Sequence, residues 1–314
     1  MNYNTLFPDN RAEGDTPLRQ AQLVMLRMLR IIDYICRKHN IGYWLCSGSL
    51  LGAVRHKGFI PWDDDLDICM IREDYDKFIK IAPYEFPKEM MLQTREADPN
   101  YNYLPLPCKV RDLNSLIISE GTENAAYNQG LFIDIFPFDR YHTKSRRLLF
   151  EKGLKSYFRV ITKCLDAKLG KERSIKNKFI SYFNPLFTWL TKSYLKHVKE
   201  VIEYNNRTLA DNHCLIGHGF DTPWRRYFKY EDIFPLKNIT FEGATVMAPQ
   251  NTNIYLSELY GKSYMTPPPE NERIQKHTVT LIPILNQIKQ EDNKYIPSSS
   301  PYSDDSGETE QGKA

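Results

Sequence analysis

The chain has 314 residues, of which 41% are hydrophobic and 13% aromatic, enough for a sizeable core in one large domain or a core with a satellite. Its formal net charge of +3 indicates no particular class of partner. No run of about eighteen apolar residues is present, which excludes a membrane-spanning helix. The first nine residues lack the basic segment and apolar core of a signal peptide. We therefore expect a soluble cytoplasmic protein, at most peripheral at the inner face of the cell membrane.

The N-terminal part predicts a polar arm followed by a long helix. Residues 1–15 are polar and are expected to form a flexible arm. Thr16 can cap a helix whose first residue is Pro17, and apolar residues then recur at helical spacing as far as about Lys38. We expect this helix to pack in the core without a chemical role.

Strands and helices alternate after this helix, which predicts an α/β or α+β fold: a mixed sheet with helices on one side. Strands are expected over 43–47, 65–71, 90–94, 106–118 and 131–136, with a short helix from Ser49 and another over 73–81.

The region 141–210 is expected to form a helical insertion that is basic and aromatic. Between Lys144 and Lys199 there are fifteen Lys or Arg residues and three acids. Packing of a helical subdomain explains this pattern, and so does a surface for anionic lipid or a polyanionic substrate. No nucleic-acid-binding module accompanies it, so we expect no nucleic acid partner.

The sequence is expected to divide into five segments. They are the arm (1–15), a mixed α/β core (16–140), the basic helical region (141–210), a C-terminal part that completes the core (211–285) and a disordered tail rich in Ser, Asp and Gly (286–314). The six cysteines are scattered without a C-x-x-C pair, which predicts reduced thiols rather than disulfides.

Four carboxylates fall within five residues, at Asp63, Asp64, Asp65 and Asp67. On a strand, residues two apart share a face, so Asp65 and Asp67 would lie side by side while Leu66 and Ile68 enter the core. Two adjacent carboxylates need a cation between them, and oxygen ligands suit Mg²⁺ or Mn²⁺. Asp63 is a supporting candidate ligand, and Asp64 is expected to face away.

Two other metal sites were tested against the sequence. An EF-hand starting at Asp63 would need Gly at its sixth position and Glu at its twelfth, where Ile68 and Asp74 stand. A zinc site at His213, Cys214 and His218 lacks a fourth ligand. Neither pattern is satisfied.

A third acid completes the pattern for phosphoryl transfer. Asp134 stands alone in the apolar run Leu-Phe-Ile-Asp-Ile-Phe, and a buried carboxylate there needs a cation or hydrogen-bond donors. Asp139 follows Pro137 and is expected in a loop.

The layout Gly48-Ser49, Asp65-Leu-Asp67-Ile and Ile133-Asp134-Ile resembles the polymerase-β-type nucleotidyltransferase superfamily. The stretch from Gly48 through Ile68 is similar, more narrowly, to the LicD family of phosphocholine and fukutin-related transferases. Further blocks resemble the same family and extend the similarity to about residues 18–280: Lys109-Val-Arg-Asp112, Phe132 to Asp139, Phe241-Glu-Gly243, Tyr260-Gly261 and Pro267 to His277.

The resemblance implies transfer of a phospho-alcohol from a CDP-linked donor such as CDP-choline, with release of CMP. The acceptor would be a hydroxyl of a cell-surface glycan, such as lipopolysaccharide or teichoic acid, or of a lipid-linked glycan precursor. Asp65, Asp67 and Asp134, with Asp63 in support, would hold Mg²⁺ or Mn²⁺. Candidate phosphate- and substrate-binding residues are Ser47, Gly48, Ser49, Arg55, His56, Trp62, Lys109, Arg111, Arg273 and His277.

Two other functions stay open at this point. An Asp-x-Asp pair also positions nucleotide-sugar diphosphates in glycosyltransferases, although the Gly-Ser turn and the lone strand acid favour the phosphotransferase. A catalytically silent scaffold on the same fold is the third hypothesis. The alcohol carried by the donor is open as well.

Overall fold

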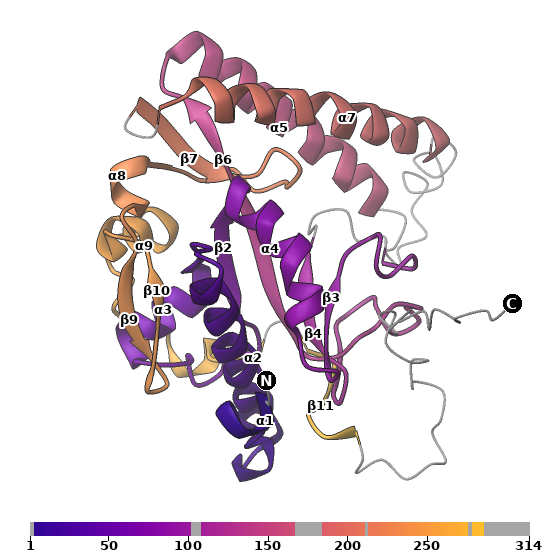
Figure 1. The fold of residues 1–314 in the computed structure, drawn as a ribbon, viewed down its shortest axis with the longest axis vertical. Helices are drawn as coiled ribbons and strands as arrows, with labels where there is room; N and C mark the ends of the chain where they lie inside the picture. The colour runs from indigo at the N-terminus through magenta and orange to yellow at the C-terminus, as the bar shows by residue number, and fades with distance from the viewer. Residues whose placement is uncertain (1–2, 102–107, 167–183, 211–212, 276–277, 286–314) are drawn as a thin grey trace, which may run out of the picture.

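A computed structural model describes residues 3–101, 108–166, 184–210, 213–275 and 278–285. Its centre is a mixed sheet in the order β1-β2-β6-β4-β3, extended from β6 by β7 and β8 (Figure 1). Within the described strands of this sheet, β2 and β6 pair in parallel, and the other pairs are antiparallel. The strands are β1 (Trp44–Leu45), β2 (Asp67–Ile71), β3 (Met90–Gln93), β4 (Lys109–Asp112), β6 (Phe132–His142), β7 (Cys214–His218) and β8 (Tyr227–Lys229).

Helices cover one face of this sheet. The helix α2 (Pro17–Lys38) begins as predicted, with the Thr16 hydroxyl accepting a hydrogen bond from the Arg19 amide at 3.1 Å. It packs with α4 (Arg72–Glu85) on the sheet, where Ile68 and Ile135 are fully buried beneath them. The sequence expectation of a mixed sheet with helices on one side is confirmed.

The helical insertion has a core of its own. Helices α5 (Ser145–Asp166) and α7 (Asn184–Thr208) pack against each other and against β6, and lie together at the end of the sheet marked by β6 and β7 (Figure 1). Phe158 and Tyr194 are buried between the two helices, and Phe220 joins them from the segment after β7. Core packing therefore accounts for part of the aromatic pattern. Leu149, Phe150 and Trp189 are exposed, so the alternative of a surface for anionic lipid or a polyanionic substrate stays open. Residues 167–183 of this region lie outside the described chain.

The remaining elements surround the sheet. A hairpin of β9 (Lys237–Phe241) and β10 (Ala244–Ala248) packs beside β1, and β5 (Leu116–Ile118) pairs with β11 (Thr280–Ile282). Three further helices are α3 (Ser47–His56), α8 (Tyr230–Ile233) and α9 (Thr252–Tyr260). A 3-10 turn, η3, spans Glu270–Glu272. No helix within the described residues is long and apolar enough to cross a membrane.

Two predicted elements differ from the structure. The strand expected over 106–118 is two strands, β4 and β5, with a turn between them, and residues 102–107 lie outside the described chain. Strand β6 continues past Pro137, so Asp139 is in a strand and fully buried rather than in a loop. The Pro137 carbonyl accepts a hydrogen bond from the Gly219 amide at 2.7 Å.

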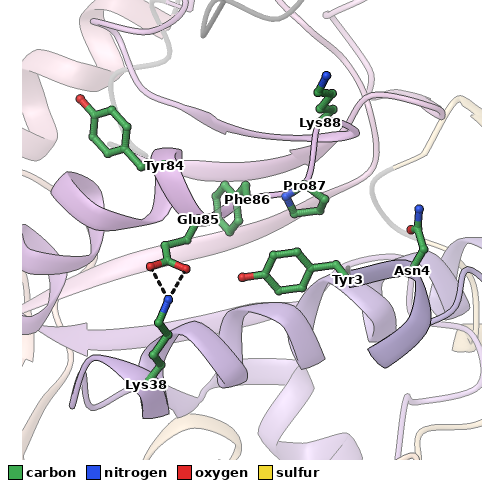
Figure 2. A pocket seen from close by; sticks show the side chains of 8 residues that line it. All are labelled: Tyr3, Asn4, Lys38, Tyr84, Glu85, Phe86, Pro87 and Lys88. Carbon is green, nitrogen blue, oxygen red and sulfur yellow. Dashed lines mark hydrogen bonds and ion pairs between the residues drawn. The ribbon is translucent and has the colours of Figure 1, made fainter. Parts of the chain in front are cut away.

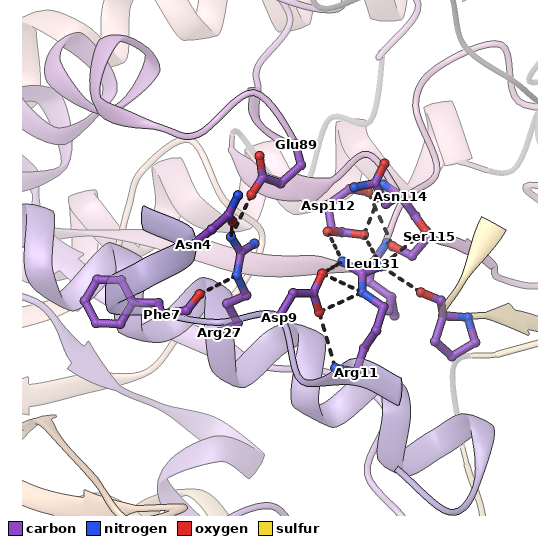
Figure 3. Close-up of polar contacts among 11 residues, drawn as sticks. Asn4, Phe7, Asp9, Arg11, Arg27, Glu89, Asp112, Asn114, Ser115 and Leu131 are labelled. Carbon is purple, nitrogen blue, oxygen red and sulfur yellow. Dashed lines mark hydrogen bonds and ion pairs between the residues drawn. The ribbon is translucent and has the colours of Figure 1, made fainter. Parts of the chain in front are cut away.

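The N-terminal arm contacts the core at some of its described residues. Helix α1 (Tyr3–Leu6) and the 3-10 turn η1 (Arg11–Glu13) lie against the core, and the Arg11 side chain enters it (Figure 3). Arg11 donates to both carboxylate oxygens of Asp112, at 2.8 and 3.1 Å, and to the Pro283 carbonyl at 2.8 Å. The polar composition of residues 1–15 predicted an arm, because the sequence does not show that Arg11 has a buried partner.

Replacing Arg11 with methionine is expected to lower the free energy of unfolding by about 3 kcal/mol, because the Asp112 carboxylate, 1% exposed, loses its cation. Chemical denaturation of the full chain measures the change. Arg19→Met is the matched control: Arg19 pairs with Glu242 near the surface, and its loss should cost less than about 1 kcal/mol. Equal costs for the two variants would contradict a buried role for Arg11.

Candidate functional site

The acids come together at the junction of β2 and β6. Asp67 is the first residue of β2, and it stands opposite Asp134 in the parallel register with β6. Asp65 precedes β2, and Leu66 and Ile68, on either side of Asp67, are fully buried. The predicted alternation of acids and core residues is confirmed, although Asp65 lies before the strand rather than in it.

Lys109 joins the acids from the other side of β6. It stands opposite Asp134 in the antiparallel register of β4, and its ammonium forms an ion pair with the Asp134 carboxylate. Register partners share a face of the sheet, so Asp67, Asp134 and Lys109 form a row across three neighbouring strands. The Lys109 ammonium also lies 3.5 Å from the centre of the Phe132 ring.

The acids repel one another. Burial raises the pKa of the Asp67 carboxyl well above its usual range, and the charges of Asp65 and Asp134 raise it further, while Lys109 opposes the shift. Burial likewise lowers the pKa of Lys109, against the pull of Asp134. The site therefore carries an excess of negative charge that a bound cation would relieve.

Two clefts meet at Asp65 and Asp67, which line both of them. The first, here called the α3 cleft, has a volume of about 440 Å³. The second, the β6 cleft, has a volume of about 350 Å³ and contains Asp134. The α3 cleft is lined further by residues of the α3 region and of the 260–274 segment: Ser47, Gly48, Leu51, Arg55, Ile60, Trp62, Asp63, Tyr260, Ser263, Tyr264, Thr266, Pro268 and Ile274.

The first turn of α3 faces the α3 cleft. Ser47 and Gly48 line it, and the side chain of Cys46, the residue before the helix, makes no capping hydrogen bond. Amide donors in the first turn of a helix suit phosphate oxygens. Ser49 has a different role: it is buried, and its hydroxyl accepts the Asp67 amide at 2.8 Å. Ser49 thus fixes the start of β2 relative to α3.

Gly48 is required at this turn by its neighbour. A Cβ atom at position 48 would lie 2.8 Å from the Asp63 Oδ2 atom, closer than carbon and oxygen normally approach. We expect Gly48→Ala to raise the KM of a phosphate-bearing substrate about tenfold by displacing the Asp63 carboxylate, with little loss of stability because that carboxylate can move. Steady-state kinetics and thermal melting measure both effects. Gly153→Ala, on α5 with open space around its Cβ, should leave the kinetics unchanged; a matching rise in KM there would refute the explanation.

Arg55, His56, Trp62 and Arg273 form a cluster at the α3 cleft. Arg55 donates to the His56 ring at 2.9 Å and to the Tyr264 carbonyl at 3.1 Å. The Arg273 guanidinium lies 5.3 Å from the centre of the Trp62 ring, and the His56 ring meets that ring edge-on. Burial and the charges of Arg55 and Arg273 lower the pKa of His56. His277 lies outside the described residues.

The β6 cleft is aromatic and mixed in charge. Arg111 is buried in its wall, where it donates to the Gln93 side chain at 2.7 Å and to the Gly130 carbonyl at 2.6 Å. These bonds fix its guanidinium in the protein, so Arg111 supports the wall beside Phe132. Besides Asp65, Asp67 and Asp134, the cleft is lined by Tyr101, Lys109, Arg111, Ile117, Ser119, Glu120, Thr122, Tyr127, Gln129, Phe132 and Trp224.

Several lining residues were missed in the sequence. Trp224, Tyr101 and Tyr127 reach the β6 cleft from segments outside the central strands, and no spacing in the sequence indicates them. Tyr260, at the end of α9, belongs to the family-like block Tyr260-Gly261 but was not among the predicted site residues; burial and the charge of Asp67 raise its pKa. Asp64 lines neither cleft, as expected, but it is buried, and the Thr278 hydroxyl donates to it.

The carboxylates have the donor chemistry for a hard divalent cation, since Asp63, Asp65, Asp67 and Asp134 offer only oxygen atoms. Within the described residues, no three His, Cys, Asp or Glu side chains are arranged to enclose a metal ion. The Asp134 carboxylate is turned toward Lys109 instead. The residue types and the excess charge fit Mg²⁺ or Mn²⁺, and binding would require these side chains to converge.

A wider hollow lies elsewhere, between α1 and the end of α4 (Figure 2). Its volume is about 730 Å³, and it is lined by Tyr3, Tyr84 and Lys88 among others. Lys38 and Glu85 pair across it at 2.7 Å. Lys38 is neutralised by this pair, and none of the clustered acids lines the hollow.

The mixed sheet and its row of acids define a nucleotidyltransferase-like core. Residues 40–163 match the family described as "LicD/FKTN/FKRP, nucleotidyltransferase domain". The resemblance seen in the motifs is confirmed over this stretch, which is similar to the nucleotidyltransferase domain of that family.

Named relatives of this chain are transferases. It is 28% identical over 268 residues to the lipopolysaccharide cholinephosphotransferase LicD of Haemophilus influenzae, a match that covers 83% of this chain and 96% of the relative. It is 40% identical over 70 residues to the ribitol 5-phosphate transferase FKRP of human and mouse, which covers 19% of this chain and 14% of each relative. These similarities support a transferase.

Proposed function

We propose that this chain transfers a phospho-alcohol group, phosphocholine-like, from a CDP-linked donor to a hydroxyl of a cell-surface glycan or of a lipid-linked glycan precursor, releasing CMP. One observation carries the proposal: Asp65 and Asp67 line both clefts, so groups bound in the two clefts would meet at the same carboxylates. A transfer between two bound substrates needs this arrangement. The names of the relatives support the class of group transferred.

The donor is assigned to the α3 cleft. Its diphosphate would accept hydrogen bonds from the amides of the first turn of α3, near Ser47 and Gly48, with Arg55 supplying positive charge. Mg²⁺ or Mn²⁺, held by Asp65 and Asp67 with Asp134 or Asp63, would offset the negative charge of the diphosphate and of these acids.

The acceptor is assigned to the β6 cleft, which holds Asp134. The acceptor oxygen forms a bond to the donor phosphorus atom to which the alcohol is attached. The bond between that phosphorus and the bridging oxygen of the diphosphate breaks. CMP leaves with the electron pair of that bond, and Asp134 takes the proton of the acceptor hydroxyl. Lys109, paired with Asp134, holds its carboxylate at the cleft.

A panel of donors tests the proposal. The full chain is incubated with CDP-choline, CDP-ethanolamine, CDP-ribitol or CDP-glycerol and Mg²⁺, with and without methyl glycosides as acceptor probes, and CMP and phosphodiester products are measured. We expect CMP release with at least one donor, loss of release with a chelator and recovery with added Mg²⁺. Release from none of the donors would overturn the proposal.

Two further measurements separate the alternative functions. A glycosyltransferase would release a nucleoside diphosphate from UDP- or GDP-sugars and form a glycoside instead of a phosphodiester. For a silent scaffold, the Asp65→Asn and Asp134→Asn variants would leave the modification of cellular glycans unchanged. Either result would replace the phosphotransferase assignment.

A further inference from the structure

The turn over residues 218–222, which follows β7, is held by side chains from behind. Lys155, on α5 and fully buried, donates from its ammonium to the His218 carbonyl at 3.1 Å and to the Thr222 carbonyl at 2.6 Å. It also donates to the Gly219 carbonyl and, at 3.2 Å, to the Thr222 hydroxyl. A buried lysine with four oxygen partners is unusual, because a charged group is seldom taken out of water without a counter-ion.

The neighbouring elements hold the same turn. The Tyr194 hydroxyl, on α7, donates to the Phe220 carbonyl at 2.8 Å, and the Tyr141 hydroxyl, on β6, donates to the His218 carbonyl at 2.6 Å. The Phe220 amide donates to the Asp139 carboxylate at 2.7 Å. The helical insertion therefore supplies polar partners to the turn as well as apolar packing.

Trp224 is two residues beyond this turn and lines the β6 cleft. Its ring meets Phe136 edge-on at 5.0 Å and lies 6.0 Å from the His218 ring. Phe136 is two residues beyond Asp134 on β6, so both side chains are on the same face of that strand. The indole is 38% exposed and lines the cleft beside the acids, where its flat apolar face suits a sugar ring.

We infer that Lys155 is a positioning residue of the site: it fixes the 218–222 turn from the helical insertion and thereby holds Trp224 as a wall of the β6 cleft. This assigns a role to the insertion, which contains none of the catalytic candidates. That the cleft receives the acceptor rests on the proposed function, whereas the link between Lys155 and Trp224 does not.

The link is tested by the fluorescence of Trp224 in the full chain. The signal of Trp224 is obtained by subtracting the spectrum of Trp224→Phe, because the chain has four tryptophans. We expect Lys155→Met to make this signal at least twice as sensitive to quenching by acrylamide. Lys199→Met, which removes an exposed lysine of α7, should leave it unchanged. Unchanged quenching in Lys155→Met would overturn the inference.

A kinetic cycle provides the second readout, with CMP release from CDP-choline as the probe. If Lys155 acts through Trp224, Lys155→Met and Trp224→Leu should each lower kcat/KM about tenfold, and the double variant should be no worse than either one. A hundredfold loss in the double variant would mean independent effects and would also overturn the inference. Absence of CMP release from the wild-type chain would count against the proposed function and leave the quenching result standing.

A milder variant keeps the inference falsifiable if Lys155→Met does not fold. Tyr194→Phe removes one hydrogen bond to the turn, at the Phe220 carbonyl, and leaves the four partners of Lys155 in place. We expect a smaller increase in the quenching of Trp224 than in Lys155→Met. In CMP release, adding Tyr194→Phe to Trp224→Leu should cause no further loss. Unchanged quenching in a folded Tyr194→Phe variant would contradict the role of the turn.

Discussion

Replacing Asp67 with asparagine should reduce CMP release by about a thousandfold or more and at the same time stabilise the fold. The loss follows because Asp67 lines both clefts and is proposed to hold the metal. The gain follows because burial, Asp65 and Asp134 all raise the pKa of this carboxyl, so its charge destabilises the folded chain. A neutral amide of the same shape removes that repulsion, and we expect the free energy of unfolding to rise by about 1 kcal/mol.

Kinetics of CMP release and chemical denaturation of the same preparations measure the two effects. Asp64→Asn is the matched control, because Asp64 is buried three residues away but lines neither cleft. It should keep its activity within about threefold, while the loss of a charged acceptor for the Thr278 hydroxyl costs roughly 1–2 kcal/mol. Retention of a tenth of the activity in Asp67→Asn, or an equal loss in Asp64→Asn, would remove Asp67 from the reaction.

Patterns confined to a short stretch of sequence predicted most of the fold. The helical repeat after Thr16 and the alternation around Asp67 depend on neighbouring residues, and both are confirmed. The Asp134 strand was recognised for the same reason: an acid between isoleucines needs a special environment. Its place opposite Asp67 is a matter of strand register, which the motif alone does not determine.

The features of the site that the sequence did not predict depend on contacts between distant segments. Lys109 and Arg111 are two residues apart on β4. The Lys109 ammonium pairs with the Asp134 carboxylate, whereas Arg111 donates to the Gln93 side chain and to a backbone carbonyl. Trp224 belongs to the site because a turn brings it there, and that turn depends on Lys155 of another element. No local rule connects these positions.

The buried arginine Arg72 shows the same dependence, and its replacement by methionine is the change expected to destabilise the chain most. Its guanidinium donates to Asp139 at 2.7 and 3.2 Å and to Asp221 at 2.7 and 3.1 Å. Asp139 is fully buried, so loss of the cation leaves an unpaired carboxylate in the core. We expect the free energy of unfolding to fall by about 5 kcal/mol. Denaturation of the full chain measures this fall. Arg37→Met is the control, because Arg37 pairs with Asp33 at the surface and its loss should lower the free energy of unfolding by less than about 1 kcal/mol.

The unpaired charge of Asp139, rather than the lost contacts of the arginine, should account for most of the lost stability. If so, adding Asp139→Asn to Arg72→Met should recover about half of the lost stability, because the amide is neutral and can still accept the Phe220 amide. A double variant less stable than Arg72→Met alone would mean that the Asp139 charge has another partner. Arg72→Met should also loosen the 218–222 turn, because Asp221 loses the same cation, and with it the position of Trp224 beside the acids.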